Sequence, residues 1–295
     1  MFDIITIGSA TRDVFLESGE IKIKKSKTSP TGLDECIPLG AKVELQDITF
    51  DTGGGATNAA ATFGNLGLKA AAICRVGKDY GGLEILQALK NRDISSKFIQ
   101  YDKNLRTAYS LILLTGSGER SILVYRGASE KISAKEIPWK EIKTKWLYVT
   151  SLSGNLALTK KIWQFAKANK IKIAWNPGGK ELGLGLAKLA PLIRQTDFFT
   201  VNIEEGARLA AVKDGNAGKI AAKLKKFCRC LAVTAGREGA YVYSRGASLY
   251  APSLAVKRVN TTGAGDAFGS GFTSSLALGR DLRHALRLGI LNSNM

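Results

Sequence analysis

The chain of 295 residues carries a formal net charge of +18, and its 45 % hydrophobic and 23 % charged residues are typical of a globular protein of one or two domains. Its single histidine, His284, argues against a histidine-built metal centre or a Ser-His-Asp triad, so acid–base chemistry is expected to fall to a carboxylate. The four cysteines form no C-x-x-C pair, no apolar run reaches the roughly 18 residues of a membrane helix, and the first residues lack a basic segment, so we expect a cytoplasmic protein without disulfides.

Apolar strand-like runs alternate with helical patterns after a first strand within residues 1–8. We predict further strands at 70–76, 146–150, 171–175, 197–202 and 231–234. Helices are predicted at 56–66, 82–90, 156–168, 184–194, 204–212 and 217–226. This βαβ repetition predicts a parallel sheet covered by helices on both faces, with ligands at the carboxyl ends of the strands.

Two segments interrupt the alternation. Residues 14–52 hold short alternating runs with prolines between them, and residues 107–126 resemble a hairpin around 116–118. We interpret them as one small β subdomain, inserted twice, that serves as a lid over a cleft. The α/β domain would then comprise the remaining ranges, 1–13, 53–106 and 127–295.

A glycine turn near the C-terminus carries the most informative pattern. It follows a strand-like run at 255–259 and opens an amphipathic helix, so Gly263, Ala264 and Gly265 would direct backbone N–H groups into a cleft. Asp266 sits beside this anion cradle, where a carboxylate can handle a proton or a metal. The alternative is an ordinary helix cap.

A second glycine turn, at 51–58, also leads into a helix. Gly53 and Gly54 permit close approach of a ligand, and Asn58 offers a donor and an acceptor to a sugar hydroxyl; the alternative is a tight loop whose Asn58 bonds its own helix. Asp13, near the end of the first strand, could bind two adjacent hydroxyls, or it could be a helix cap or a surface ion pair. Ser151 and Ser153 end another strand and either face the sugar or serve as turn residues.

Four ordered motifs resemble those of the ribokinase-like, PfkB-type carbohydrate kinase family, and the match spans essentially the whole chain. They are Gly53-Gly54-x-x-x-Asn58, Asn202-x-x-Glu205, Thr234-x-Gly236-x-x-Gly239 and the highly specific Thr261-x-Gly263-Ala264-Gly265-Asp266. The resemblance implies a ribokinase-like α/β fold, a doubly wound and mostly parallel sheet with helices on both faces, plus a small inserted β-sheet lid. In this family the lid often pairs with the lid of a second subunit, which implies a homodimer.

The resemblance also implies ATP-dependent transfer of the γ-phosphoryl group to a sugar hydroxyl. Asp266 would be the general base, and the anion hole would consist of Gly263, Ala264 and Gly265. The sugar would be held by Asp13, Gly53, Gly54 and Asn58. Magnesium would be organised through water by Asn202 and Glu205, and the nucleotide would be flanked by Thr234, Gly236 and Gly239.

Two departures from the family pattern concern the nucleotide and a monovalent cation. Position 260 is Asn where the family usually has Asp, and this loss of charge predicts weaker potassium activation. The sequence ends at Met295, whereas the family typically continues through another loop and helix that cover the adenine and complete the cation site. We therefore expect this departure to bear on the affinity for the nucleotide.

A ribose-like sugar is the first choice of substrate, and a nucleoside is the runner-up. Arg120 and Arg126 could recognise an acidic sugar, or they could simply be solvated. A different class also stays open: a basic nucleic-acid binder or a kinase fold without catalysis. The lysine clusters fall at exposed-looking helical spacings without interleaved aromatic residues, which favours a solvated surface over nucleic acid as a partner.

Overall fold

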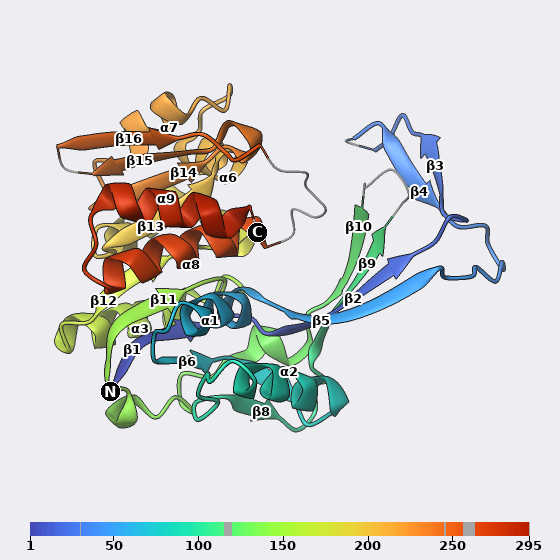
Figure 1. The fold of residues 1–295 in the computed structure, drawn as a ribbon, viewed down its shortest axis with the longest axis horizontal. Helices are drawn as coiled ribbons and strands as arrows, with labels where there is room; N and C mark the ends of the chain where they lie inside the picture. The colour runs from blue at the N-terminus through green and yellow to red at the C-terminus, as the bar shows by residue number, and fades with distance from the viewer. Residues whose placement is uncertain (30, 115–119, 245, 256–262, 295) are drawn as a thin grey trace.

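The structure, a computed structural model, describes residues 1–29, 31–114, 120–244, 246–255 and 263–294. Within these ranges the largest sheet has eight strands in the order β16-β15-β14-β13-β12-β11-β1-β6 (Figure 1). They are β1 (Phe2–Ile7), β6 (Ala70–Ile73), β11 (Thr144–Val149), β12 (Lys172–Trp175), β13 (Phe198–Asn202), β14 (Cys230–Thr234), β15 (Ala240–Ser244) and β16 (Ala247–Ala251). Within this sheet, β14, β13, β12, β11, β1 and β6 pair in parallel with their neighbours. Strands β15 and β16 are added antiparallel at the β14 edge. This confirms the predicted doubly wound, mostly parallel sheet.

Helices cover both faces of this sheet. One face carries α1 (Gly55–Asn65), α8 (Ala264–Ala277) and α9 (Leu282–Ser293). The other carries α3 (Leu156–Ala168), α5 (Leu186–Ile193), α6 (Ile203–Ala210) and α7 (Ala217–Leu224). The remaining described helices are α2 (Tyr80–Lys90), α4 (Gly179–Leu182) and the 3-10 turns η1 (Gly127–Lys131), η2 (Trp139–Glu141) and η3 (Gly236–Glu238). None of the helices in the described ranges is long and apolar enough to span a membrane.

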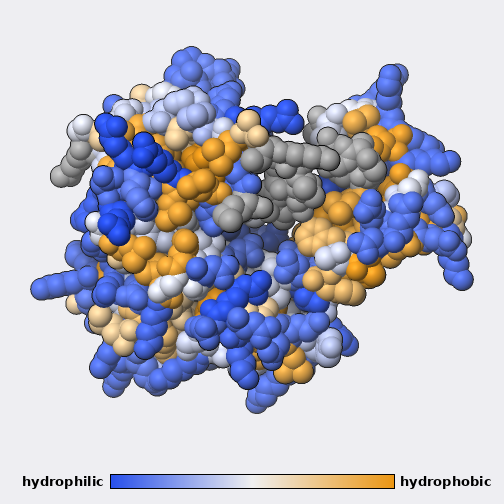
Figure 2. All heavy atoms as spheres, viewed as in Figure 1, coloured by the Kyte–Doolittle hydropathy of each residue, from blue (hydrophilic) through white to orange (hydrophobic). Residues whose placement is uncertain are grey.

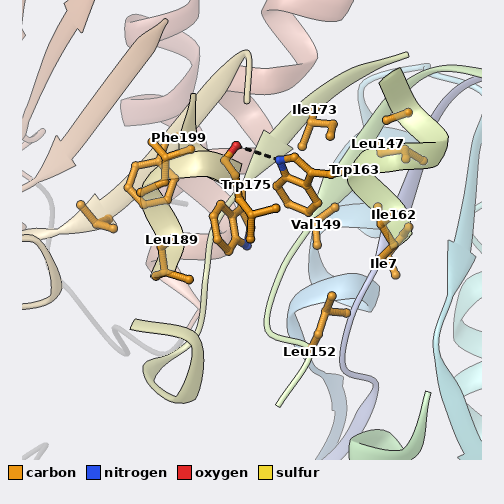
Figure 3. Close-up of a cluster of buried hydrophobic side chains, with 14 of the residues drawn as sticks. Ile7, Leu147, Val149, Leu152, Ile162, Trp163, Ile173, Trp175, Leu189 and Phe199 are labelled. Atoms are coloured by element: carbon orange, nitrogen blue, oxygen red, sulfur yellow. Dashed lines mark hydrogen bonds between the residues drawn. The ribbon is translucent and has the colours of Figure 1, made fainter. Parts of the chain in front are cut away.

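Alternating strand residues build a separate core on each face, because successive side chains in a strand point to opposite sides. On the α3 and α5 side, Trp175 of β12 packs against Trp163 and Phe199, with ring centroids 4.9 and 5.5 Å away (Figure 3). The indole N–H of Trp163 donates to the Leu192 carbonyl at 2.8 Å and so ties α3 to α5. Phe198, the neighbour of Phe199 in β13, instead stacks on Phe272 of α8. Both helix layers are thereby fixed to the sheet that positions the site.

A second, four-stranded sheet projects from the body of the molecule (Figure 1). Its order is β10-β9-β2-β5, from β10 (Arg120–Tyr125), β9 (Ala108–Leu114), β2 (Thr11–Glu17) and β5 (Asp47–Gly53). A separate hairpin, β3 (Lys22–Lys25) with β4 (Leu33–Cys36), lies between β2 and β5 in the chain. The four strands come from the two segments that interrupt the α/β pattern, while the hairpin turn expected at 116–118 lies outside the described residues. The division into two domains at the stated boundaries stays a prediction.

Hydrophobic side chains remain exposed on this small sheet (Figure 2). Phe50 of β5 is 56 % exposed and Leu123 of β10 is 57 % exposed, and Ile48, Ile122, Val124 and Tyr125 are also exposed. A sheet that packs one face on the core normally keeps its other face polar. The small sheet therefore has apolar side chains that the described residues leave uncovered.

Two predicted elements differ from the observed ones. The strand expected at 70–76 is divided at Cys74: β6 joins the main sheet, whereas β7 (Arg75–Gly77) pairs with β8 (Gln100–Asp102). The helix expected at 184–194 begins at Leu186, because Gly185 has φ +83°, a left-handed conformation that interrupts the helical backbone. The strand-like run at 255–259 falls almost entirely outside the described residues.

Candidate active site

Two cavities meet at the start of α8. The sheet-end cavity, about 320 Å³, lies at the carboxyl ends of the parallel strands, and its lining includes Ser151, Asn202, Glu205, Thr234, Gly265 and Asp266. The small-sheet cavity, about 360 Å³, lies where the small sheet joins α1, and its lining includes Asp13, Phe15, Gly53, Asn58, Arg92 and Ala267. Gly263 lines both cavities. The two glycine turns predicted from the sequence thus come together, although some 200 residues separate them.

Asp266 lies in the first turn of α8 and faces the sheet-end cavity. Its Oδ2 accepts a hydrogen bond of 3.3 Å from the side-chain amide of Asn58, on the neighbouring helix α1. Burial raises the pKa of Asp266 to about 6; the bond from Asn58 works in the opposite direction, and the negative charge of Glu205 adds to the rise. The carboxylate is therefore charged at neutral pH yet far more basic than an exposed aspartate.

The backbone around Asp266 is open toward the cavities. Gly263 caps α8 in a left-handed conformation, with φ 80° and ψ −2°, and a Cβ on Gly265 would meet no atom of the described residues within 4 Å. Ala264 is the first residue of the helix between them. The first N–H groups of a helix have no acceptor within the helix and form an anion-binding site. The motif residues Thr261 and Thr262, and the family departure at Asn260, lie outside the described residues.

The turn before α1 is crowded by the protein itself. A Cβ on Gly53 would overlap the carboxylate of Asp13, and a Cβ on Gly54, at φ +98°, would lie 2.6 Å from the Ser9 carbonyl oxygen. The hydroxyl of Thr57 donates to the carbonyls of Gly53 and Gly54 and so closes the turn. These glycines allow β2, β5 and the start of α1 to converge, which places Asp13 and Asn58 in one cavity.

Asp13 of β2 lines the small-sheet cavity with an unsatisfied oxygen. Burial raises its pKa; the hydroxyl of Ser110 and the charge of Arg12 lower it, and the charge of Asp51 raises it. Among the residues that the structure describes, Asp13 Oδ1 is buried without a hydrogen-bond partner. An unpaired buried acceptor costs about 1–3 kcal/mol, so this oxygen is suited to accept a hydrogen bond from a ligand.

Asn202 and Glu205 form a reciprocal cap at the start of α6. The Glu205 N–H donates to the Asn202 side chain at 2.8 Å, and the Asn202 N–H donates to Glu205 Oε2 at 2.9 Å. Burial raises the pKa of Glu205, while its bond from the Asn202 backbone lowers it. The pair holds the Glu205 carboxylate in the lining of the sheet-end cavity, which Asp266 also lines.

The residues expected near a nucleotide are only partly in the cavity. Thr234, at the end of β14, lines it. Gly236 and Gly239 lie in and after the 3-10 turn η3 that follows, outside the lining of both cavities. At Gly239 the left-handed φ of 104° allows the chain to turn back into β15. The 3-10 turn itself is exposed, whereas Gly239 is buried and packs against Ala251.

The donor set suits a magnesium ion that is shared with phosphates. Two carboxylates, Asp266 and Glu205, line the sheet-end cavity, and within the described ranges no three His, Cys, Asp or Glu residues cluster into a metal centre. Magnesium is usually bound by one or two carboxylates together with water and substrate phosphates. The residues present fit that arrangement and not a metal cage built from protein alone.

Several lining residues were missed by sequence reasoning, and Asn176 and Arg92 are two of them. Asn176 lies in the sheet-end cavity directly after β12, so the rule that ligands bind at strand ends could have found it. Arg92, which lies after α2 and lines the small-sheet cavity, has no sequence signal. It reaches the site only because α2 packs beside α1.

The sequence and the fold are similar to those of known kinases. The chain is 28 % identical to a ribokinase from Mus musculus over 238 residues, which cover 78 % of this chain and 72 % of that protein. A structure of Arabidopsis thaliana ribokinase complexed with ribose and ATP has a TM-score of 0.79 at 19 % identity, covering 99 % of this chain and 91 % of that one. A Burkholderia thailandensis nucleoside kinase in complex with inosine has a TM-score of 0.77 at 20 % identity, covering 99 % and 90 %.

These two structural likenesses show a ribokinase-like fold. A family model provides the stronger statement, because it matches nearly the whole chain: the pfkB family carbohydrate kinase model covers residues 4–291. The expectation drawn from the four motifs is confirmed, and the protein belongs to the pfkB family of carbohydrate kinases.

Proposed function

We propose that this protein transfers the γ-phosphoryl group of ATP to a hydroxyl of a ribose-like sugar. The observation that carries the proposal is the carboxylate of Asp266, held by Asn58 at the point where two polar cavities meet. A phosphoryl donor and a sugar in separate cavities would both reach this carboxylate. The ribokinases among the relatives, one of them complexed with ribose and ATP, support this choice of substrates.

The small-sheet cavity would bind the sugar. Asp13 Oδ1 would accept a hydrogen bond from a sugar hydroxyl, which satisfies the buried oxygen that lacks a partner among the described residues. Gly53 and Gly54 let the backbone pack closely around Asp13, and Asn58 offers its amide to the same hydroxyls. These contacts would orient one hydroxyl toward Asp266.

Asp266 would act as the general base. As the sugar oxygen forms its bond to the γ-phosphorus, the hydroxyl proton moves to the carboxylate, and the bond from phosphorus to the leaving ADP oxygen breaks. A pKa of about 6 leaves Asp266 ionised at pH 7 and able to accept this proton. The N–H groups of Gly263, Ala264 and Gly265, at the positive end of α8, would stabilise the transferred group.

The ends of β13 and β14 would serve the nucleotide. Asn202 and Glu205 would hold magnesium through water, and Thr234, Gly236 and Gly239 would flank the nucleotide. When bound, magnesium would neutralise the charge that develops on the phosphates. A monovalent cation would contribute little, because Asn260 lacks the charge of the usual aspartate.

We further propose that the small sheet is a lid and that it pairs with the lid of a second copy. The apolar side chains it leaves exposed, among them Phe50 and Leu123, support a partner surface.

The four cysteines are free thiols, which supports a reducing, cytoplasmic location.

A nucleoside is the second candidate substrate. Phe15 lines the small-sheet cavity with Asp13 and offers an aromatic surface to a base. The nucleoside kinase bound to inosine shares this fold. In that case the furanose ring would occupy the same position as a free sugar.

A coupled ADP-release screen tests the proposal. Pentoses, hexoses, sugar phosphates and nucleosides are each added with Mg-ATP, with and without potassium, and Asp266→Asn serves as the blank. We expect ADP release with a ribose-like sugar, at similar rates with and without potassium. Retained ATP binding without turnover of any acceptor would contradict the proposal, as would salt-sensitive binding of RNA or DNA in the absence of ATP.

A further inference from the structure

Glu181 is a buried carboxylate that lines neither cavity. It lies in α4 and is 1 % exposed. Its Oε1 accepts hydrogen bonds of 2.7 Å from the backbone N–H groups of Leu152 and Gly154, and its Oε2 accepts bonds of 3.1 Å from the Gly178 N–H and the Ser151 hydroxyl. Four donors converge on one carboxylate, which is the condition under which a buried charge is tolerated.

The four bonds connect two loops that line the sheet-end cavity. Ser151 follows β11 and Gly178 follows β12, and both residues line that cavity. In the loop that follows β11, Ser153 has φ +59° and Gly154 has φ +78°. A left-handed backbone is unfavourable for a serine. Glu181 holds the amides on either side of Ser153 and so stabilises this loop conformation.

The same bonds determine what Ser151 can offer to a ligand. Its hydroxyl proton points to Glu181 Oε2, and its oxygen accepts a bond of 3.3 Å from the Ser153 N–H. A serine hydroxyl has one proton and two acceptor positions. With the proton directed to Glu181, Ser151 can face the cavity only as an acceptor.

An acceptor cannot bind a phosphate oxygen, so Ser151 needs a donor such as a sugar hydroxyl. The sheet order supports the sugar, because β11 lies next to β1, while Asn202 and Thr234 end the more distant β13 and β14. Ser9 and Gly55, which adjoin the first glycine turn, line the cavity with Ser151. The side of the cavity at Ser151 therefore borders the proposed sugar position.

We propose that Glu181 is a positioning residue that fixes Ser151 as a hydrogen-bond acceptor for a sugar hydroxyl. This inference rests on the proposed sugar kinase function and adds a specificity contact to it. The contact selects sugars by their ability to donate a hydrogen bond at the position that faces Ser151. A sugar with an O–H group there binds, and an analogue whose group there can only accept does not.

Substrate analogues test the contact directly. The best sugar of the screen is compared with its monodeoxy and monofluoro forms, in the wild type and in Ser151→Ala. In the wild type, deoxy and fluoro forms at one position should both raise KM about tenfold, because neither can donate. In Ser151→Ala, the KM for the parent sugar should rise by the same factor. The deoxy and fluoro forms should then show no additional rise in KM. A fluoro form as good as the parent at every position would show that no sugar hydroxyl donates to Ser151, and would overturn the inference.

Glu181→Gln tests the positioning role. One amide oxygen replaces two carboxylate oxygens, so we expect the sugar KM to rise about tenfold with kcat and the KM for Mg-ATP within about twofold. Hydrogen exchange measured without substrate should accelerate in the peptide containing Leu152 and Gly154 and stay unchanged in α8. Ser153→Ala, in the same loop but outside the cavity lining, is the matched control and should behave like the wild type.

The outcomes separate the two proposals. A wild-type protein that phosphorylates no sugar overturns the proposed function and this inference with it. An active wild type whose sugar KM is unchanged by Ser151→Ala overturns the inference alone, as does a change confined to the KM for Mg-ATP. If Glu181→Gln does not fold, the Ser151→Ala and fluoro-sugar comparison still decides the result.

Discussion

The two glycine turns have similar sequences but opposite surroundings. In the turn before α1, Cβ atoms on Gly53 and Gly54 would strike Asp13 and Ser9. In the turn before α8, a Cβ on Gly263 would come no closer than 3.5 Å to Asn58, and one on Gly265 would meet no described atom within 4 Å. The first turn needs glycine because the protein fills the space, whereas the described residues leave the space at the second turn open.

This difference separates structural glycines from those that face a ligand. The first turn packs two strands of the small sheet and α1 so that Asp13 and Asn58 are correctly placed. The second turn opens into both cavities and presents Asp266 and the helix N-terminus. We therefore expect substitutions in the first turn to cost stability and substitutions in the second to cost activity.

Asp266→Asn should have the largest effect on activity, and it acts in the second turn. Loss of the general base should lower kcat by about 10³-fold, within the 10²–10⁴ range for such groups.

The same variant should change stability. Because burial raises the folded pKa of Asp266 from 3.8 to about 6, its ionisation removes stability as pH rises through that interval. Asparagine removes this cost, so the free energy of unfolding at pH 7 should increase by up to about 3 kcal/mol.

Denaturant titration and single-turnover kinetics on the same preparation check both parts. Wild-type-like turnover in Asp266→Asn would exclude this carboxylate as the base. A less stable variant would indicate that Asp266 is structural.

Gly54→Ala should have the largest effect on stability. Its Cβ would lie 2.6 Å from the Ser9 carbonyl oxygen at a φ of +98°, so we expect a loss of roughly 2–4 kcal/mol in the free energy of unfolding. Gly67→Ala is the matched control, since Gly67 has φ +78° but open space around its Cβ position. It should lose only the 1–2 kcal/mol of a left-handed alanine. Equal losses in urea titrations would show that crowding in the first turn is unimportant.

Gly265→Ala should lower activity and leave the fold unchanged. The added methyl group enters open space, so the free energy of unfolding should stay within about 0.5 kcal/mol of the wild type. It also enters the sheet-end cavity, where it would displace the transferred group from the N–H donors and reduce kcat at least tenfold. Full activity in this variant would remove the second turn from the anion hole.

Asn58→Ala should have the smallest effect on activity. Asn58 follows the first turn and bonds to Asp266, which follows the second turn, so the variant tests the link between them. The Asn58 amide lowers the pKa of Asp266, so its loss should raise that pKa and move the acid limb of activity to higher pH. The sugar KM should rise several-fold at pH 8, because a neutral hydrogen bond contributes about 1 kcal/mol. The measurement is a pair of pH–rate profiles, and an unshifted limb would show that the two turns are not electrostatically coupled.

The features found from sequence were those that depend on short-range pattern. The glycine turns, the Asn202 and Glu205 cap and the helix start at Asp266 each occupy a few consecutive residues, and the structure has all three. The parallel sheet followed from alternating periodicities. The roles assigned to these residues stay predictions.

The features that sequence reasoning missed depend on long-range packing. Glu181 lies about 30 residues from the loop it organises, and no motif relates it to Ser151. The edge strands β15 and β16 were missed because a short antiparallel hairpin interrupts the βαβ rhythm. The division of 70–76 between two sheets depends on pairing with β8, about 25 residues further on. Such contacts are formed by tertiary structure and leave little local signal.

The pH dependence of wild-type kcat/KM for the sugar, at saturating Mg-ATP, tests the central claim that Asp266 is the catalytic base. We predict an acid limb with a midpoint near pH 6, below which kcat/KM falls about tenfold per pH unit as the carboxylate is protonated. A profile that stays flat from pH 7 down to pH 5 would contradict the account.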